Sequence, residues 1–212
     1  MRRVLWRLRD AAQKLFPKAT LALLANRTWV LEPEVALIPL LARRDGIAID
    51  AGANKGVYLF HMSRFFARVI AIDPLPALAN YLKRAAPANV DVNACALSRS
   101  EGEAVLRLPR GFIELGSLEP HSAQDWTTGA EVEEHVVKLA TLDSMALDNV
   151  SLIKIDVEGH ELAVIDGARQ TIGRCRPALL IEIEERHNRN AVHTVTKALA
   201  GLGYAGFYLD GF

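Results

Sequence analysis

From residue 33 onward, the hydrophobic positions switch repeatedly between helical spacing and short continuous runs. The short runs are typical of buried strands, and the spaced positions are typical of amphipathic helices. Their alternation predicts the doubly wound α/β class, in which helices cover both faces of a mainly parallel sheet. The predicted strands are 47–49, 68–72, 90–94, 102–108, 136–139, 152–155, 178–183 and 207–209, and the predicted helices are 33–44, 57–66, 74–82, 162–172 and 192–199.

Before this alternation, residues 2–16 form the pattern of a basic amphipathic helix, with apolar positions at helical spacing beside four arginines and a lysine. We favour a helix that packs on the domain or on a partner. The alternative is an interfacial helix that makes peripheral membrane contact with acidic lipid, with Trp6 at the headgroup level. The chain is therefore divided into an N-terminal helical extension, residues 1–31, and one α/β domain, residues 32–212.

A second irregular segment spans residues 109–131, where prolines, glycines, Trp126 and His121 show little periodicity. The pattern predicts a long loop. Loops of this length in compact domains often act as lids or binding segments. We expect acceptor recognition to depend on this loop and on the N-terminal helix.

The composition of the chain disfavours several classes of protein. Half of the 212 residues are apolar, and 25 basic residues balance 25 acidic ones, which disfavours nucleic acid as a partner. Cys95 and Cys175 lack metal-ligand spacing and are interpreted as reduced core thiols of a cytoplasmic protein. We find neither a signal peptide nor an apolar run of the roughly 18 residues that span a bilayer.

The sequence GIAIDAGANKG at residues 46–56 places Asp50 at the end of a buried strand and Gly52 and Gly56 in the loop that follows. Small residues there let a ligand lie against main chain near a helix start. The loop lacks the third glycine of the dinucleotide fingerprint, and the chain has no phosphate loop. This combination favours a nucleoside ligand without a pyrophosphate, of which S-adenosylmethionine is the commonest.

Acidic residues follow four of the predicted strands, where a doubly wound sheet binds its ligand. One of them, Asp73, ends the second strand and could accept both hydroxyls of a ribose. Dehydrogenases and methyltransferases share such an acid. These strand-end acids are Asp50, Asp73, Asp156 with Glu158, and Glu182 with Glu184.

The segment LIKIDVEGHE, residues 152–161, places charges within an apolar strand. A buried charge must be paired, so we predict that Lys154 meets a carboxylate, with Glu182 as the leading candidate. Such an ion pair could also be structural only. His160 stands at a predicted helix start, where the helix dipole favours the neutral imidazole that can accept a proton, although the nearby acids oppose this. The other histidines show no pairing in the sequence.

Six segments resemble the FkbM family of S-adenosylmethionine-dependent methyltransferases. The resemblance covers about residues 30–210, and the ANKG and KIDVEGHE motifs are its most specific parts. It implies a Rossmann-like class I methyltransferase sheet and methyl transfer, typically to oxygen, on carbohydrates, polyketides or other secondary metabolites. The segments are AIDAGANKGVY (48–58), VIAIDP (69–74), ACALSRSEGEAV (94–105), TLD (141–143), IKIDVEGHELAVIDGA (153–168) and PALLIEI (177–183).

Carried over by position, the resemblance assigns two groups of residues to the site. The acceptor chemistry falls to Asp156, Glu158 and His160. Family members usually continue into a final antiparallel strand, whereas this chain stops at Phe212, so we expect a sheet that lacks this strand. The cofactor group comprises Asp50, Gly52, Asn54 and Gly56 for the methionine part, Asp73 for the ribose, and Ala96 and Leu97 for the adenine.

The predicted reaction is attack of an acceptor hydroxyl on the sulfonium methyl, with Asp156 or His160 as the base. The acceptor is expected to be a small molecule or a glycan. No metal ligand is assigned, although the same acids with His160 could bind magnesium or a transition metal. Two rival interpretations are a catalytically silent cofactor-binding or interaction protein and a NAD-dependent oxidoreductase, the latter disfavoured by the incomplete glycine pattern.

Overall fold

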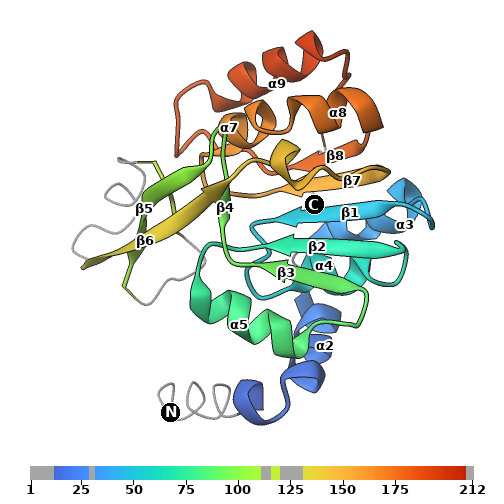
Figure 1. The fold of residues 1–212 in the computed structure, drawn as a ribbon, viewed down its shortest axis with the longest axis vertical. Helices are drawn as coiled ribbons and strands as arrows, with labels where there is room; N and C mark the ends of the chain where they lie inside the picture. Colours follow the sequence, from blue (N-terminus) through green and yellow to red (C-terminus); the bar gives the residue numbers. More distant parts are fainter. Residues whose placement is uncertain (1–11, 29–31, 111–115, 120–130, 209–212) are drawn as a thin grey trace.

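The computed structural model of the protein describes residues 12–28, 32–110, 116–119 and 131–208. Its centre is a sheet with the strand order β3-β2-β1-β7-β8, in which all neighbouring strands are parallel (Figure 1). The predicted α/β fold class is therefore confirmed. The five strands are β1 (Ile47–Ala51), β2 (Arg68–Ile72), β3 (Val90–Asn93), β7 (Val150–Ile155) and β8 (Ala178–Ile181).

Alternate residues of the central strands face two separate cores, because successive side chains of a strand point to opposite faces. Ile49 of β1 packs in one core with the three C-terminal helices, and Ala48 packs in the other with the N-terminal ones. The sheet is thus covered on both faces, as the continuous apolar runs predicted. The first layer holds α7 (Glu161–Asp166), α8 (Arg169–Cys175) and α9 (Ala191–Gly201), and the second holds α2 (Pro17–Thr28), η1 (Pro33–Leu37), α3 (Ile38–Leu41), α4 (Val57–Met62) and α5 (Pro76–Ala85).

A second, smaller sheet lies beside the main one and has the order β4-β6-β5 (Figure 1). Its long strands are antiparallel, and residue 107 also forms an isolated bridge with Ser117 in the segment 116–119. The small sheet packs its own apolar cluster against Leu75 and Leu78 at the start of α5. Its strands are β4 (Ala96–Leu97), β5 (Gly102–Pro109) and β6 (Val132–Ala140).

The helix predicted at 162–172 is two helices, α7 and α8, which are separated at Gly167. A Cβ at this position would lie 2.0 Å from the carbonyl oxygen of Ser98, so the chain passes too close for a side chain. Asp143, in the short helix η3 (Asp143–Met145), accepts hydrogen bonds from the amides of Gln170 and Thr171 and so caps the start of α8. The break therefore comes from contacts with segments far away in sequence.

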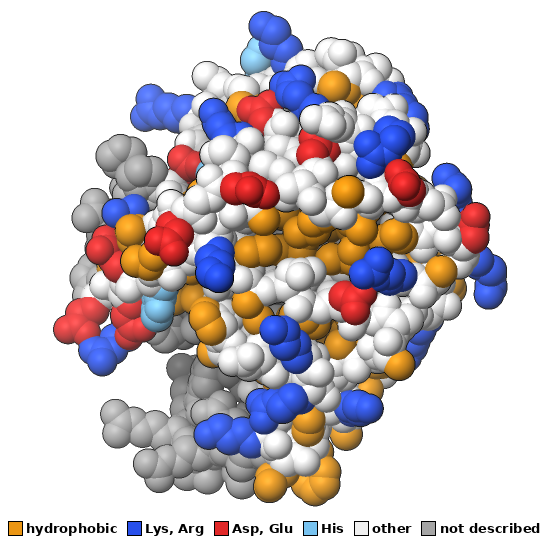
Figure 2. All heavy atoms as spheres, viewed as in Figure 1, with side chains coloured by type: hydrophobic (Ala, Val, Ile, Leu, Met, Phe, Trp, Pro, Cys, Tyr) orange, Lys and Arg blue, Asp and Glu red, His pale blue; other side chains and the backbone are white. Residues whose placement is uncertain are grey.

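At the C-terminus, the strand predicted at 207–209 is wrong for its described residues, because Phe207 and Tyr208 form no strand and are 95% and 78% exposed. Within the described part of the chain, β8 is one of the two edge strands of the main sheet, and β3 is the other. Hydrophobic side chains gather in the middle of one face, over β7 and β1, and charged side chains surround them (Figure 2).

At the N-terminus, the predicted helix 2–16 lies largely outside the described residues. The structure adds α2, which buries Leu21 and Ala25 against the domain. The histidine of α4, His61, contacts the Ala25 carbonyl oxygen at 3.2 Å. None of the described helices combines the length and the apolar character that crossing a membrane requires. Of the predicted loop 109–131, the segments 111–115 and 120–130 also lie outside the described residues.

Candidate functional site

A cavity of about 1530 Å³ lies at the carboxyl ends of the central strands. The residue that directly follows each of four strands lines it, namely Gly52, Asp73, Asp156 and Glu182. Strand ends converge in this way in doubly wound sheets, and the sequence prediction rested on the same rule. The cavity therefore joins the glycine loop after β1 to the acids after β7 and β8.

The glycine loop takes a conformation that requires glycine at position 52. Gly52 has φ +78°, and a Cβ there would lie 1.8 Å from the Asp156 carbonyl oxygen. The amides of Gly52 and Ala53 both donate to the Ile72 carbonyl oxygen at 3.0 Å, which binds the loop to the end of β2. Gly56, with φ +86°, begins α4 and faces the apolar side chains of α2 and α5, away from the cavity.

Asp73 connects this loop to the turn after β2. Its carboxylate accepts the amide of Asn54 at 2.9 Å and the amide of Leu75 at 2.9 Å. Burial raises the pKa of Asp73 to about 6, although these two amides favour the charged form. Both Asn54 and Asp73 line the cavity, and the Oδ1 atom of Asn54 is buried without a hydrogen-bond partner among the described residues.

Ala96 and Leu97, predicted for the adenine, form β4 and line the same cavity. Asp50 is fully buried behind the cavity wall, where it accepts the Leu59 amide of α4 at 2.9 Å. Of the seven residues predicted to hold a cofactor, Asp50 and Gly56 thus shape the loop from behind, and the other five lie on the cavity surface.

Lys154 is buried at the centre of the site and pairs with two aspartates. Its Nζ lies 3.1 Å from Asp156 Oδ2 and 3.5 Å from Asp50 Oδ1, and it donates to the Gly52 carbonyl oxygen at 3.0 Å. The prediction that Lys154 meets a carboxylate is confirmed, but the leading candidate, Glu182, was wrong. The register of the parallel strands places Asp50 directly beside Lys154, whereas the β8 neighbour of Lys154 is Leu180.

These charges shift one another's ionisation. Burial alone would lower the pKa of Lys154, but the nearby carboxylates, first Asp156 and then Asp50 and Glu32, together raise the pKa above its ordinary value. Burial raises the pKa of Asp50 despite the nearby ammonium group. The ring of Tyr58 lies under the same Nζ, 4.8 Å from it, as a cation–π contact. Lys154 is therefore held as an ammonium ion.

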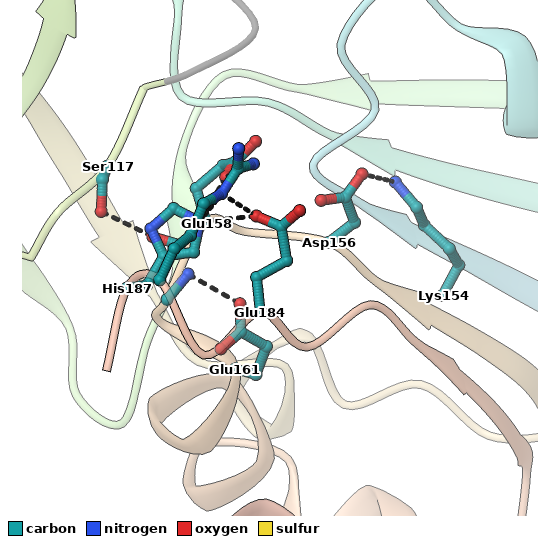
Figure 3. Close-up of polar contacts among 9 residues, drawn as sticks. Ser117, Lys154, Asp156, Glu158, Glu161, Glu184 and His187 are labelled. Atoms are coloured by element: carbon teal, nitrogen blue, oxygen red, sulfur yellow. Dashed lines mark hydrogen bonds and ion pairs between the residues drawn. The ribbon is translucent and has the colours of Figure 1, made fainter. Parts of the chain in front are cut away.

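Asp156 lies beside Lys154, and Glu158 lies farther from the lysine, together with Glu184 and His187 (Figure 3). Asp156 keeps 30% of its side chain exposed, and Glu158 keeps 17%. Burial, followed by repulsion from Asp156, raises the pKa of Glu158 to about 8. Its carbonyl oxygen accepts the Ser117 hydroxyl at 2.6 Å, so the segment 116–119 is attached to this loop.

His187 is a site residue that the sequence did not reveal. Its side chain is 1% exposed, and its Nε2 lies 2.7 Å from Glu158 Oε2 and 3.1 Å from Glu184 Oε2 (Figure 3). Arg186 also forms ion pairs with both glutamates. The sequence offered only the spacing Glu184-x-x-His187 after a strand, which is too common a pattern to single out this histidine.

His160, predicted as an alternative base, directly precedes α7 and lines the cavity. Both of its ring nitrogens contact protein groups: Nδ1 lies 2.8 Å from Glu119 Oε1, and Nε2 lies 2.9 Å from Ser98 Oγ. The hydrogen bond from the imidazole lowers the pKa of Glu119. The Glu119 carboxylate can only accept, so Nδ1 carries a hydrogen and donates to it, and Nε2 of the neutral ring accepts the Ser98 hydroxyl. This geometry engages the lone pair that a general base would use.

Comparison with known proteins identifies the fold and the family. A family model described as the methyltransferase FkbM domain matches residues 50–205. Among solved structures, the crystal structure of methyltransferase FkbM from Methylobacillus flagellatus KT matches with a TM-score of 0.53 at 20% sequence identity, which supports the Rossmann-like fold alone. That match covers 75% of this chain and 38% of the other, so this chain spans well under half of that protein's length. A search of curated proteins found none that matches. Since the family model covers well over half of the residues, the chain belongs to the FkbM methyltransferase domain family.

Proposed function

We propose that the protein is an S-adenosylmethionine-dependent methyltransferase that acts on a hydroxyl group of a carbohydrate, a polyketide or another secondary metabolite. One observation carries the proposal. A single cavity is lined by the glycine loop with Asn54, by the ribose-type acid Asp73, and by the partly exposed carboxylate of Asp156. Family membership supports methyl transfer as the chemistry.

The cofactor side fits a nucleoside. Asp73 uses each oxygen once for a backbone amide, and each oxygen retains a lone pair for a ribose hydroxyl. The buried Oδ1 of Asn54 offers an acceptor to a ligand amino group, and Gly52 lets a ligand approach main chain. Ala96 and Leu97 would contact the adenine, while Asp50 and Gly56 would maintain the loop that faces the methionine part. When bound, S-adenosylmethionine supplies an electrophilic methyl group on a sulfonium ion.

On the acceptor side, Asp156 would orient the attacking hydroxyl and accept its proton. An alcohol is a poor nucleophile until its proton is leaving, and a base within hydrogen-bond distance assists this step. Asp156 has one oxygen on Lys154, while the other is not used by that ion pair. His160 engages both nitrogens with protein groups, so we assign it to positioning the loop of Glu158. Most of the acceleration would come from alignment in a site that excludes water.

Calorimetry with S-adenosylmethionine and with NAD tests the cofactor side. We expect binding of the first and none of the second, and the reverse result would support an oxidoreductase. Transfer of labelled methyl from S-adenosylmethionine to acceptors in an extract then tests catalysis. Cofactor binding without transfer to any acceptor would indicate a catalytically silent binding protein.

The variant Asp156→Ala distinguishes a role in acceptor activation from a role in cofactor binding. It should abolish turnover and leave S-adenosylmethionine affinity within about threefold, because the aspartate faces the acceptor. A large loss of cofactor affinity would place Asp156 on the cofactor side instead. The conservative variant Asp156→Asn keeps the shape but cannot accept the proton, so it should be as inactive as the alanine variant.

A further inference from the structure

We propose that Glu158, Glu184 and His187 bind a divalent metal ion beside the methyl-transfer site. Each residue offers one ligand atom within 4.8 Å of the others, and His187 Nε2 contacts Oε2 of both glutamates. This set differs from the one considered from the sequence, because His160 is engaged elsewhere and His187 replaces it.

The spacing of the ligand atoms suits a metal ion. Octahedral ions with metal–oxygen distances of about 2.1 Å place neighbouring ligand atoms about 3 Å apart. The two distances from His187 Nε2 to the carboxylate oxygens, 2.7 and 3.1 Å, match this separation. Only one N–H or one lone pair exists at Nε2, so a single proton would have to be shared between both carboxylates, whereas one metal ion would satisfy all three atoms.

His187 is held in place by its neighbours, and the two glutamates face the cavity. His187 is held by close packing on Gly159, where a Cβ would lie 2.7 Å from the histidine Cβ, and by Asn188, which donates to the Gly159 carbonyl oxygen at 2.8 Å. Glu158 and Glu184 line the cavity. An ion held by these three ligands would keep its remaining coordination positions for water or for hydroxyl groups that enter from the cavity.

Arg186 provides the positive charge at this position in the structure. It pairs with Glu184, lies 3.5 Å from Glu158 Oε2 and lies 3.4 Å from His187 Nε2. Its side chain is 46% exposed and can turn outward when an ion arrives. Arg186 therefore acts as a competitor of the metal ion. The mixture of one imidazole and two carboxylates favours Mn²⁺ and similar ions over Ca²⁺.

The role of the ion rests on the proposed function: it would hold an acceptor hydroxyl next to Asp156 and lower the pKa of that hydroxyl. Metal binding itself does not depend on that role. Titration of the chelator-treated full chain with MnCl₂, in the absence of S-adenosylmethionine and of any acceptor, tests the site alone. If Mn²⁺ does not bind, the metal site is refuted while the cofactor-binding and methyl-transfer assays still test the proposed function. If those assays fail, the Mn²⁺ titration still tests the metal site.

Electron paramagnetic resonance follows the loss of free Mn²⁺. We expect one saturable site, an affinity at least about tenfold weaker in Glu184→Gln and in His187→Gln, and a nitrogen coupling to the bound ion that His187→Gln removes. Glu133→Gln is the matched control, because this exposed glutamate pairs with Arg110 and is not one of the three proposed ligands. Glu184 is 33% exposed, so its variant should fold even if the variant of the buried histidine does not.

Arg186→Ala distinguishes a metal site from a structural ion-pair cluster. Removal of the competitor should raise Mn²⁺ affinity about two- to fivefold for each of the two partly exposed ion pairs that Arg186 forms. Arg174→Ala, which removes an arginine of equal exposure that pairs with Asp148, should leave the affinity unchanged. Absence of saturable binding, equal binding by wild type and Glu184→Gln, or weaker binding by Arg186→Ala would each overturn the proposal.

Discussion

Lys154→Met removes the ammonium group between two aspartates and keeps most of the side-chain volume. Asp50 is fully buried, and the Lys154 Nζ at 3.5 Å faces the oxygen that the Leu59 amide does not use. Asp156 is 30% exposed and can be rehydrated, so the cost of the substitution falls mainly on Asp50. Breaking one partner of a buried ion pair typically costs about 3–5 kcal/mol.

The cost should depend on pH. Burial already raises the pKa of Asp50, and removal of Lys154 should raise it further. When the pKa of a carboxyl group is higher in the folded than in the unfolded state, the unfolding free energy of the protein decreases with rising pH. The decrease begins at the unfolded pKa, about 3.9, and ends above the folded pKa. The difference in unfolding free energy between wild type and Lys154→Met should therefore be largest at neutral pH and shrink toward pH 4.

Urea unfolding of both proteins at pH 7 and pH 5 measures this difference. Lys83→Met on the exposed side of α5 is the control and should lie within about 0.5 kcal/mol of wild type. In an Asp50→Asn background, Lys154→Met should cost much less, because no buried charge is left. A loss below about 1 kcal/mol at pH 7, or an equal loss in both backgrounds, would refute the reasoning.

Two further predictions concern Gly52 and Asp73, which are proposed to face the cofactor. Gly52→Ala should lower the unfolding free energy by about 3 kcal/mol, because of the positive φ and the contact with the Asp156 carbonyl oxygen. Thermal unfolding measures this loss, and the control Gly173→Ala, in open space on α8, should be neutral or stabilising. Equal effects of the two substitutions would contradict the close approach at Gly52. S-adenosylmethionine affinity, measured by calorimetry, should fall between pH 7 and pH 5, because Asp73 with a pKa of about 6 gains a proton and loses acceptor capacity. Asp73→Asn should bind weakly at both pH values, and a wild-type affinity unaffected by pH would remove Asp73 from the ribose contact.

The sequence predicted the central strands β1, β2 and β7 well because they are buried on both faces. Continuous apolar runs are then forced, and β2 was placed at its observed bounds, Arg68–Ile72. The helix at 162–172 could not be divided from sequence alone. Its break depends on the Ser98 carbonyl oxygen, which reaches Gly167 from about seventy residues away. Local periodicity carries no information about such a contact.

The partner of Lys154 shows a similar limit at the site. The sequence required a carboxylate, since an unpaired charge in a buried strand is too costly. It could not choose between acids at neighbouring strand ends, because the choice depends on register. In the structure, Asp50 stands directly opposite Lys154, and Asp156 lies two residues farther along the same face. His187 was missed for the same reason: its partners come together only when the β7 and β8 loops meet.

Lys154 also links the glycine loop to Asp156, the proposed base. Its Nζ donates to the Gly52 carbonyl oxygen and to Asp156, at 3.0 and 3.1 Å. A displacement of this ammonium group therefore moves both the loop and the aspartate, whereas removal of the Asp156 carboxylate leaves the hydrogen bond to Gly52 in place. Lys154→Met should lower S-adenosylmethionine affinity and turnover together, in contrast to Asp156→Ala, which should lower turnover alone. If both variants changed turnover alone, the glycine loop would keep its shape without Lys154, and the hydrogen bonds from Gly52 and Ala53 to Ile72 would be sufficient to hold it.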